Sequence, residues 1–241
     1  MADPLMRRLG RESRWSLVAQ FGQMAAQQLV HTLGRQLGLR KPIGLDPEAL
    51  VLPDSALCRK AVGFVAEVSP AYLLNHGIRS FVFGSAIGRY DGFEFDPELL
   101  FLACVMHDLG LVPQCEGPED FEIEGARTAR RSLIGWGTEV DRADIVHEAI
   151  ALHARIGRAQ RKSPEAALTH LGAGMDVIGV RKEDFDRAEV ERVVEHWPRE
   201  GFKRCFSQRL SAEARMKPDS NIAGHVGLGF IRKIETAPFA E

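Results

Sequence analysis

The sequence predicts an all-α fold, a single bundle of about eight to ten helices. Apolar residues recur at spacings of three and four along most of the 241 residues, which is the period of helices with one buried face. The alternation of apolar and polar residues that is typical of strands is scarce, and only residues 80–85 and 226–234 resemble it. No internal repeat or linker rich in Pro, Gly or Ser divides the chain. We therefore expect one domain over residues 51–241, with residues 1–50 as an N-terminal helical extension packed on it.

Local signals predict the first three helices. Residues 12–38 carry an apolar stripe with glutamines on the opposite face. Asp54 is a predicted N-cap for the next helix, and Ser69-Pro70 opens a longer one that ends near Gly92. The stripe of the first helix consists of Trp15, Val18, Phe21, Met24, Ala25 and Leu29.

The fourth helix has the strongest start signal in the chain. Asp96 suits the N-cap, Pro97 the first helical position, and Glu98 the positive end of the helix dipole. The sequence that follows, LLFLACVM, is apolar nearly all round, so this helix should be buried. It should stop just after His107, where Gly110 can take a left-handed C-terminal conformation.

Five further helices are expected after a turn-rich loop at residues 113–120. Each begins at a proline, an acidic residue or a clear break in the apolar pattern. Their expected ranges are about 121–134, 139–156, 164–176, 184–197 and 202–216.

Composition excludes several classes of protein. Lys plus Arg total 31 and Asp plus Glu total 33, so the formal net charge of −2 does not favour a nucleic-acid polymer as partner and favours a small-molecule substrate. The longest apolar run, residues 99–106, is far too short to span a bilayer. The N-terminus lacks the apolar core of a secretory signal, and the four cysteines form no CxxC pair. We expect a cytoplasmic protein with no membrane association.

A set of histidines and aspartates carries the candidate chemistry. His107-Asp108 ends the most apolar helix, where a carboxylate is costly to bury unless it is paired or bound to metal. Taken alone, the dipeptide also fits a histidine at a helix end beside a solvent-facing acid. His76 lies on an earlier helix with apolar flanks. Asp176 lies on a later one, on a face of small residues, and an acid there needs either a metal or an arginine partner.

Together these four residues form a His₂Asp₂ set from three helices. Imidazole and carboxylate ligands suit one divalent transition metal such as zinc, iron or manganese. A metal with open positions lowers the pKa of bound water from 15.7 toward about 7 and so yields hydroxide at neutral pH. Asp108 could also accept the proton of that water. Arg79, one turn after His76, is expected to pair with an acid.

The same residues resemble the HD superfamily of metal-dependent hydrolases. The resemblance covers about residues 55–180 and rests on the segments LLNHGIRSF, LLFLACVMHDLGL, AIALHARIG and LTHLGAGMDVIG. It implies that the metal ligands are His76, His107, Asp108 and Asp176.

Within that superfamily, the chain resembles the cyanamide hydratase-like branch. Leu111 stands where many HD phosphohydrolases have a lysine, and the segments FEIEGA and AIALH match that branch. The branch implies attack by a metal-activated hydroxide on a small electrophilic carbon, as in hydration of a nitrile. Two alternatives remain: cleavage of a nucleotide or other phosphoester with help from arginine clusters at 127–131 and 155–162, and a catalytically silent module that binds a nucleotide or a protein.

Four further residues are candidates for the substrate pocket. His153 faces the predicted core and matches a pocket position of the family, so we expect it to be catalytic, to contact substrate, or both. His147, a second candidate, lies six positions earlier, about 120° around the helix, so the two histidines cannot both point straight into one site. Glu124 follows the turn-rich loop, and His225 lies in a glycine-rich stretch that could fold over the pocket. A homodimer through the glutamine-rich face of the first helix is also possible.

Overall fold

The computed structural model describes residues 14–45 and 51–241, and over these residues the chain is all-α as predicted. No strand forms there, and a single isolated bridge pairs Ile43 with Phe185. The eleven α-helices of the described residues exceed the expected eight to ten, because the weakly patterned tail folds into two short helices. They are α2 (Arg14–Gln36), α3 (Ala56–Val68), α4 (Ala71–Asp91), α5 (Pro97–Met106), α6 (Phe121–Gly135), α7 (Val140–Leu152), α8 (Pro164–Ile178), α9 (Arg187–His196), α10 (Phe202–Met216), α11 (Asn221–Gly227) and α12 (Phe230–Glu235).

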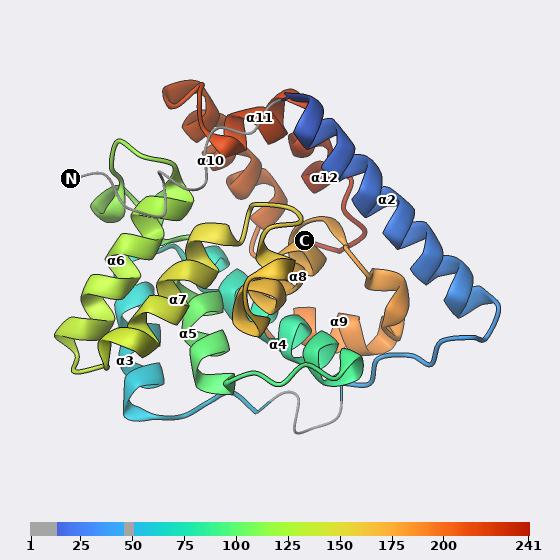
Figure 1. The fold of residues 1–241 in the computed structure, drawn as a ribbon, viewed down its shortest axis with the longest axis horizontal. Coiled ribbons are helices and arrows are strands. Elements are labelled where there is room, and N and C mark those ends of the chain that lie inside the picture. The colour runs from blue at the N-terminus through green and yellow to red at the C-terminus, as the bar shows by residue number, and fades with distance from the viewer. Residues whose placement is uncertain (1–13, 46–50) are drawn as a thin grey trace.

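Helix α5 lies inside the bundle, packed against α3, α4, α7 and α8 (Figure 1). Its predicted start is confirmed: the Asp96 carboxylate accepts hydrogen bonds from the backbone N–H groups of Glu98 at 2.9 Å and Leu99 at 3.1 Å. Every residue from Leu99 to Met106 is buried. The helix that ends in the His-Asp dipeptide is thus held on all sides, which fixes where that dipeptide projects.

Helices α4 and α8 approach each other unusually closely, at a pair of glycines. A Cβ at Gly84 would lie 2.6 Å from the carbonyl oxygen of Leu168, and a Cβ at Gly172 would overlap the carbonyl oxygen of Ser80. The predicted face of small residues on α8 is therefore a helix-packing face. It brings His76 on α4 beside Asp176 on α8, although 100 residues separate them.

Two predicted helix boundaries differ in detail from the structure. Ser55, rather than Asp54, is the N-cap of α3 and accepts from the N–H of Cys58. Gly110 does not take a left-handed conformation, whereas Gly92 does, with φ of 75°. Gly110 is required for another reason: a side chain there would collide with the backbone carbonyl of Phe121, so α6 packs directly on the segment after α5.

Helix α2 lies along one edge of the molecule, with α11 and α12 on its inner side (Figure 1). The apolar stripe seen in its sequence does not face the core over most of its length: Trp15 is 82% exposed and Leu29 is 58% exposed. Phe21 and Met24 do face inward, and Leu17 is buried. The expected boundary between extension and domain at residue 50 lies outside the described residues.

None of the helices in the described ranges combines the length and the apolar character that a membrane span requires.

The α4–α8 contact gives a stability prediction. Gly172→Ala should lower the free energy of unfolding by about 1–3 kcal/mol, because the added methyl group has no space against the α4 backbone. Gly63→Ala on α3, where a Cβ meets nothing, is the matched control and should stabilise by about 0.5–1 kcal/mol. Urea unfolding of both variants measures the difference. Equal effects of the two substitutions would contradict the close packing.

Candidate metal centre

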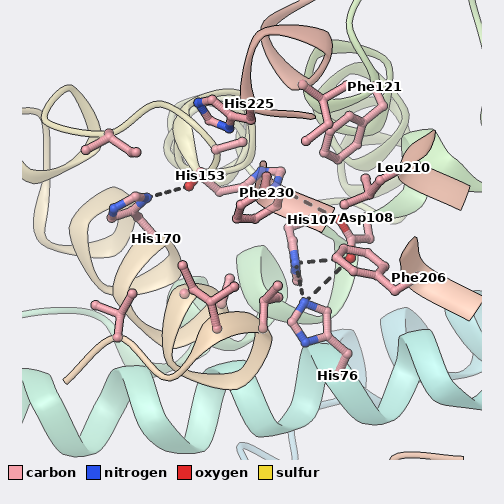
Figure 2. Close-up of a pocket in the computed structure, with 18 of the residues that line it drawn as sticks. His76, His107, Asp108, Phe121, His153, His170, Phe206, Leu210, His225 and Phe230 are labelled. Carbon is pink, nitrogen blue, oxygen red and sulfur yellow. Dashed lines mark hydrogen bonds and ion pairs between the residues drawn. The ribbon is translucent and has the colours of Figure 1, made fainter. Parts of the chain in front are cut away.

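Three side chains from two neighbouring segments converge at the end of α5. His76 comes from α4, His107 is the C-terminal cap of α5, and Asp108 follows it. The Nε2 atoms of the two histidines lie 3.1 Å apart, and Asp108 Oδ2 lies 3.6 Å from the first and 3.4 Å from the second (Figure 2). One ligand atom from each residue therefore lies within 4.8 Å of the other two, close enough to share one ion.

The hydrogen bonds behind the two rings determine which nitrogen faces the centre. His107 Nδ1 donates to the carbonyl oxygen of Cys104 at 2.6 Å, and His76 Nδ1 donates to Asp176 Oδ2 at 2.7 Å. In neutral rings bonded this way, both Nε2 atoms carry lone pairs. Two facing lone pairs cannot hydrogen-bond each other, so a cation between them is the arrangement that uses both.

Asp108 supplies the test of whether the residues fit a metal. The residue is 6% exposed, and neither carboxylate oxygen has a hydrogen-bond partner among the described residues. A buried carboxylate without such partners is strongly unfavourable unless a cation binds it. The donor set therefore fits a divalent metal, and its nitrogen and oxygen donors suit zinc, iron or manganese.

The structure places the Asp176 carboxylate apart from the three converging ligand atoms. It lies behind His76, on Nδ1. Arg79 donates to both of its oxygens, at 2.7 and 2.8 Å, and Arg199 donates to Oδ1 at 3.0 Å. Burial alone would raise the pKa of Asp176, but the two guanidinium groups outweigh burial and hold the pKa well below its usual range. Of the two predicted partners, metal or arginine, the structure shows arginine.

His153 stands on the opposite side of Asp108 from His76. Its Nδ1 donates to the carbonyl oxygen of Ile150 at 2.7 Å, so Nε2 faces Asp108 Oδ1 at 3.9 Å (Figure 2). Burial, followed by the nearby His107, lowers the pKa of His153 well below its ordinary value. The ring is therefore neutral and presents an acceptor nitrogen to the centre.

A cavity of about 80 Å³ opens from these residues toward α2 and α11. Its walls are mostly aromatic and aliphatic, and among the described residues that line it there is no lysine or arginine. His225 faces the cavity at a distance from His76 (Figure 2), and its buried Nε2 has no hydrogen-bond partner among the described residues. Burial, and then the charge of nearby groups, lowers the pKa of His225 to about 4, so this ring is neutral too.

Comparison with known proteins agrees with this geometry. The HD domain family model matches residues 73–189. The chain is also similar to two proteins of Saccharomyces cerevisiae, cyanamide hydratase DDI2 and cyanamide hydratase DDI3. Each is 25% identical over 194 residues, which cover 78% of this chain and 86% of the yeast protein.

The HD domain match contains the converging ligands but not the whole cavity wall. His225 on α11 and Phe206 on α10 come after the matched segment, and Phe21 and Met24 on α2 come before it. The cavity is therefore completed by helices outside the HD domain.

Two of the predicted pocket residues lie outside the cavity. His147 is half-buried on α7 and does not line it. Glu124 accepts hydrogen bonds from the N–H of Glu119 and from Arg127, so it shapes the loop before α6. The Glu124 carboxylate is therefore paired with groups close to it in sequence, which the sequence pattern alone did not reveal.

Arg79 pairs with an acid as expected, whereas sequence analysis missed Arg199. Arg199 lies in the turn between α9 and α10, fully enclosed by Asp176 and the rings of Phe202 and Phe239. No periodicity marks a turn residue as buried, so only the tertiary contact identifies it.

The two aspartates should behave oppositely when each is changed to asparagine. Asp176→Asn leaves two buried arginines without their counter-charge and should lower the free energy of unfolding of the metal-free protein by about 3–5 kcal/mol. Asp108→Asn removes a carboxylate that has no hydrogen-bond partner, so it should leave that free energy unchanged or raise it while abolishing metal binding. Urea unfolding in chelator, with metal analysis by mass spectrometry, tests both. Unimpaired stability of Asp176→Asn with lost metal would restore Asp176 as a ligand.

Glu122 gives a pH prediction for the helix that carries His225. Glu122 accepts from Asn221 Nδ2 at 3.1 Å, and Asn221 also donates to the carbonyl of Ala154, so α11 is tied to α6 and to the end of α7. Burial, and then the nearby Asp120, raises the pKa of Glu122 from 4.5 to about 7. Its contribution to stability is therefore fully present below pH 4.5 and is lost as the pH rises to about 7.

Glu122→Gln keeps the acceptor and removes the titration, so its stability should fall less over that range than the wild type's. Urea unfolding at a series of pH values measures the two curves. Glu67→Gln, on the exposed side of α3, is the control for loss of one carboxylate. Parallel curves for Glu122→Gln and wild type would show that Glu122 titrates normally.

Proposed function

We propose that this protein adds water to a small, neutral, electrophilic molecule such as a nitrile or cyanamide. The HD domain and the similarity to cyanamide hydratases support a metal-dependent hydrolase or hydratase in general. The observation that supports the narrower proposal is the cavity. At about 80 Å³, it has room for about five to eight waters at roughly 10–15 Å³ each.

A nucleotide is a poor match to this cavity. Pockets for drug-sized ligands measure roughly 300–1,000 Å³, and a phosphate would need cationic partners. Two of the arginines that could have served a phosphoester are engaged elsewhere, Arg130 with Asp144 and Arg155 with Asp120, and no arginine of either cluster lines the cavity. A silent binding module is also disfavoured, because it has no need for the unsatisfied carboxylate of Asp108.

Each side chain of the centre has a role in this proposal. His76, His107 and Asp108 hold the metal, which when bound acts as a Lewis acid and lowers the pKa of water. Asp176 orients His76 and fixes its tautomer. In hydration, the water oxygen bonds to the nitrile carbon, one π pair moves to nitrogen, and that nitrogen gains a proton. His153 and Asp108 are the groups placed to take the water's proton and return it.

His225 is the proposed contact for the other end of the substrate. Its neutral ring offers a polar nitrogen in a mostly apolar wall, and its ring centroid lies 5.4 Å from that of Phe21 and 5.8 Å from that of Phe230. A polar group on the substrate would satisfy that nitrogen, as a buried polar atom requires. This arrangement favours small molecules that carry a polar group, donor or acceptor, beside the electrophilic carbon.

Substrate panels test the proposal directly. Protein loaded separately with zinc, iron or manganese should hydrate cyanamide or a small nitrile and should not cleave phosphoesters. His153→Ala should lower kcat by about 10²–10⁴-fold with its metal content retained, because it removes proton transfer but no ligand. His147→Ala, on the same helix but outside the cavity, is the control and should keep wild-type kcat. Phosphoester cleavage without hydration, or equal effects of the two alanines, would refute the proposal.

A further inference from the structure

Helix α2 is oriented opposite to an ordinary surface helix. Such a helix turns its apolar side toward the domain and its polar side toward solvent. In the C-terminal half of α2 the inward side is polar. Gln28 donates a hydrogen bond to the carbonyl oxygen of Gly179, and His31 Nδ1 lies 2.8 Å from Asp184 Oδ2. We call this inward line the inner seam; it comprises Leu17, Phe21, Met24, Gln28, His31 and Arg35.

The opposite side of α2 is apolar and uncharged. No charged side chain stands at any exposed position from residue 15 to residue 37 within the described helix and the turn after it. The exposed fractions of the larger side chains are 82% for Trp15, 42% for Val18, 58% for Leu29, 66% for Val30, 46% for Leu33 and 70% for Leu37.

The exposed apolar area on this side of α2 is close to the area that one partner buries in a protein–protein interface. From these exposed fractions it offers on the order of 700 Å² of apolar surface, close to the roughly 800 Å² per partner of a standard interface. Monomeric proteins rarely expose contiguous apolar patches above a few hundred Å². No other helix of the described chain lies on this side of α2 (Figure 1).

The spacing of the exposed residues shows what can cover them. We call the line of exposed positions opposite the inner seam the outer seam; it comprises Trp15, Ala19, Gly22, Ala26, Leu29 and Leu33. Successive spacings are four, three, four, three and four, the pattern of the a and d positions in a coiled coil. The helix thus has two seams. The inner seam packs on its own domain, and the outer seam is exposed in the described chain.

The outer seam is complementary to itself. If two copies of α2 cross antiparallel about a two-fold axis near residue 24, Trp15 meets Leu33 of the second copy, Ala19 meets Leu29, and Gly22 meets Ala26. Large residues then lie at the ends and small ones at the centre, which lets the two backbones approach closely. A two-fold interface requires one patch that pairs with itself in this way.

We infer that the outer seam of α2 is the contact through which two copies of this chain form an antiparallel homodimer. The contact is the apolar side of the helix rather than its glutamines. Because Phe21 and Met24 on the same helix line the cavity, the dimer also fixes one wall of the candidate site from behind.

The mass of the full chain in solution tests this inference. Light scattering after gel filtration should give twice the 26.7 kDa of one chain at micromolar concentration. Leu29→Glu/Leu33→Glu should give a monomer, with a dissociation constant at least about 100-fold higher, since four charges would be buried at the seam. Both positions are exposed in the single chain, so circular dichroism and thermal unfolding should show an intact fold.

Gln23→Glu/Gln27→Glu is the matched control, with the same change in charge on the same helix beside the outer seam, and it should remain a dimer. A monomeric wild type, or a Leu29→Glu/Leu33→Glu variant that stays dimeric, would overturn the inference. A monomeric wild type that sediments with phospholipid vesicles would identify a membrane surface as the occupant and would equally overturn it. Hydration activity and metal content are measured separately from the mass, so this test can fail without the proposed function failing.

Discussion

The candidate site depends on one buried ionic contact, the carboxylate of Asp176 between the guanidinium groups of Arg79 and Arg199. All three side chains are completely enclosed, so their mutual attraction must offset a large cost of desolvation. The contact joins α4, α8 and the turn before α10 at one point. Its fourth member is His76, whose Nδ1 donates to the same carboxylate and whose Nε2 is thereby directed into the centre.

The centre itself combines two opposite electrostatic conditions. Behind His76 every charge has a partner, whereas in front of it two histidine lone pairs and the Asp108 carboxylate face one another with none. Such an arrangement is costly in the empty protein and favourable once a divalent cation is present. Rigid packing of α5 on all sides keeps the three groups together despite that cost. Binding a divalent cation would relieve this repulsion between the three groups, which the packing of the surrounding helices keeps close together.

The cavity is formed jointly by the segment that matches the HD domain and by helices around it. The ligands lie inside the matched segment, but α2, α10 and α11 lie outside it and form much of the rest of the wall. These helices make the cavity small and apolar and add one polar nitrogen, from His225. Since α2 also carries the proposed dimer contact, the size of the cavity and the assembly of the protein are controlled by the same helix.

The sequence alone determined those features that arise within one element or between close neighbours. The caps at Asp96 and Gly92, the burial of α5, and the presence of His107 and Asp108 at its end all follow from local patterns. Tertiary structure decided the features that depend on distant partners. The charge of Asp176 could be satisfied by a metal or by an arginine, and the choice required Arg199 from 23 residues away. Likewise, the apolar stripe of α2 showed that a face must be covered, but periodicity carries no information on whether the chain's own core or a second molecule covers it.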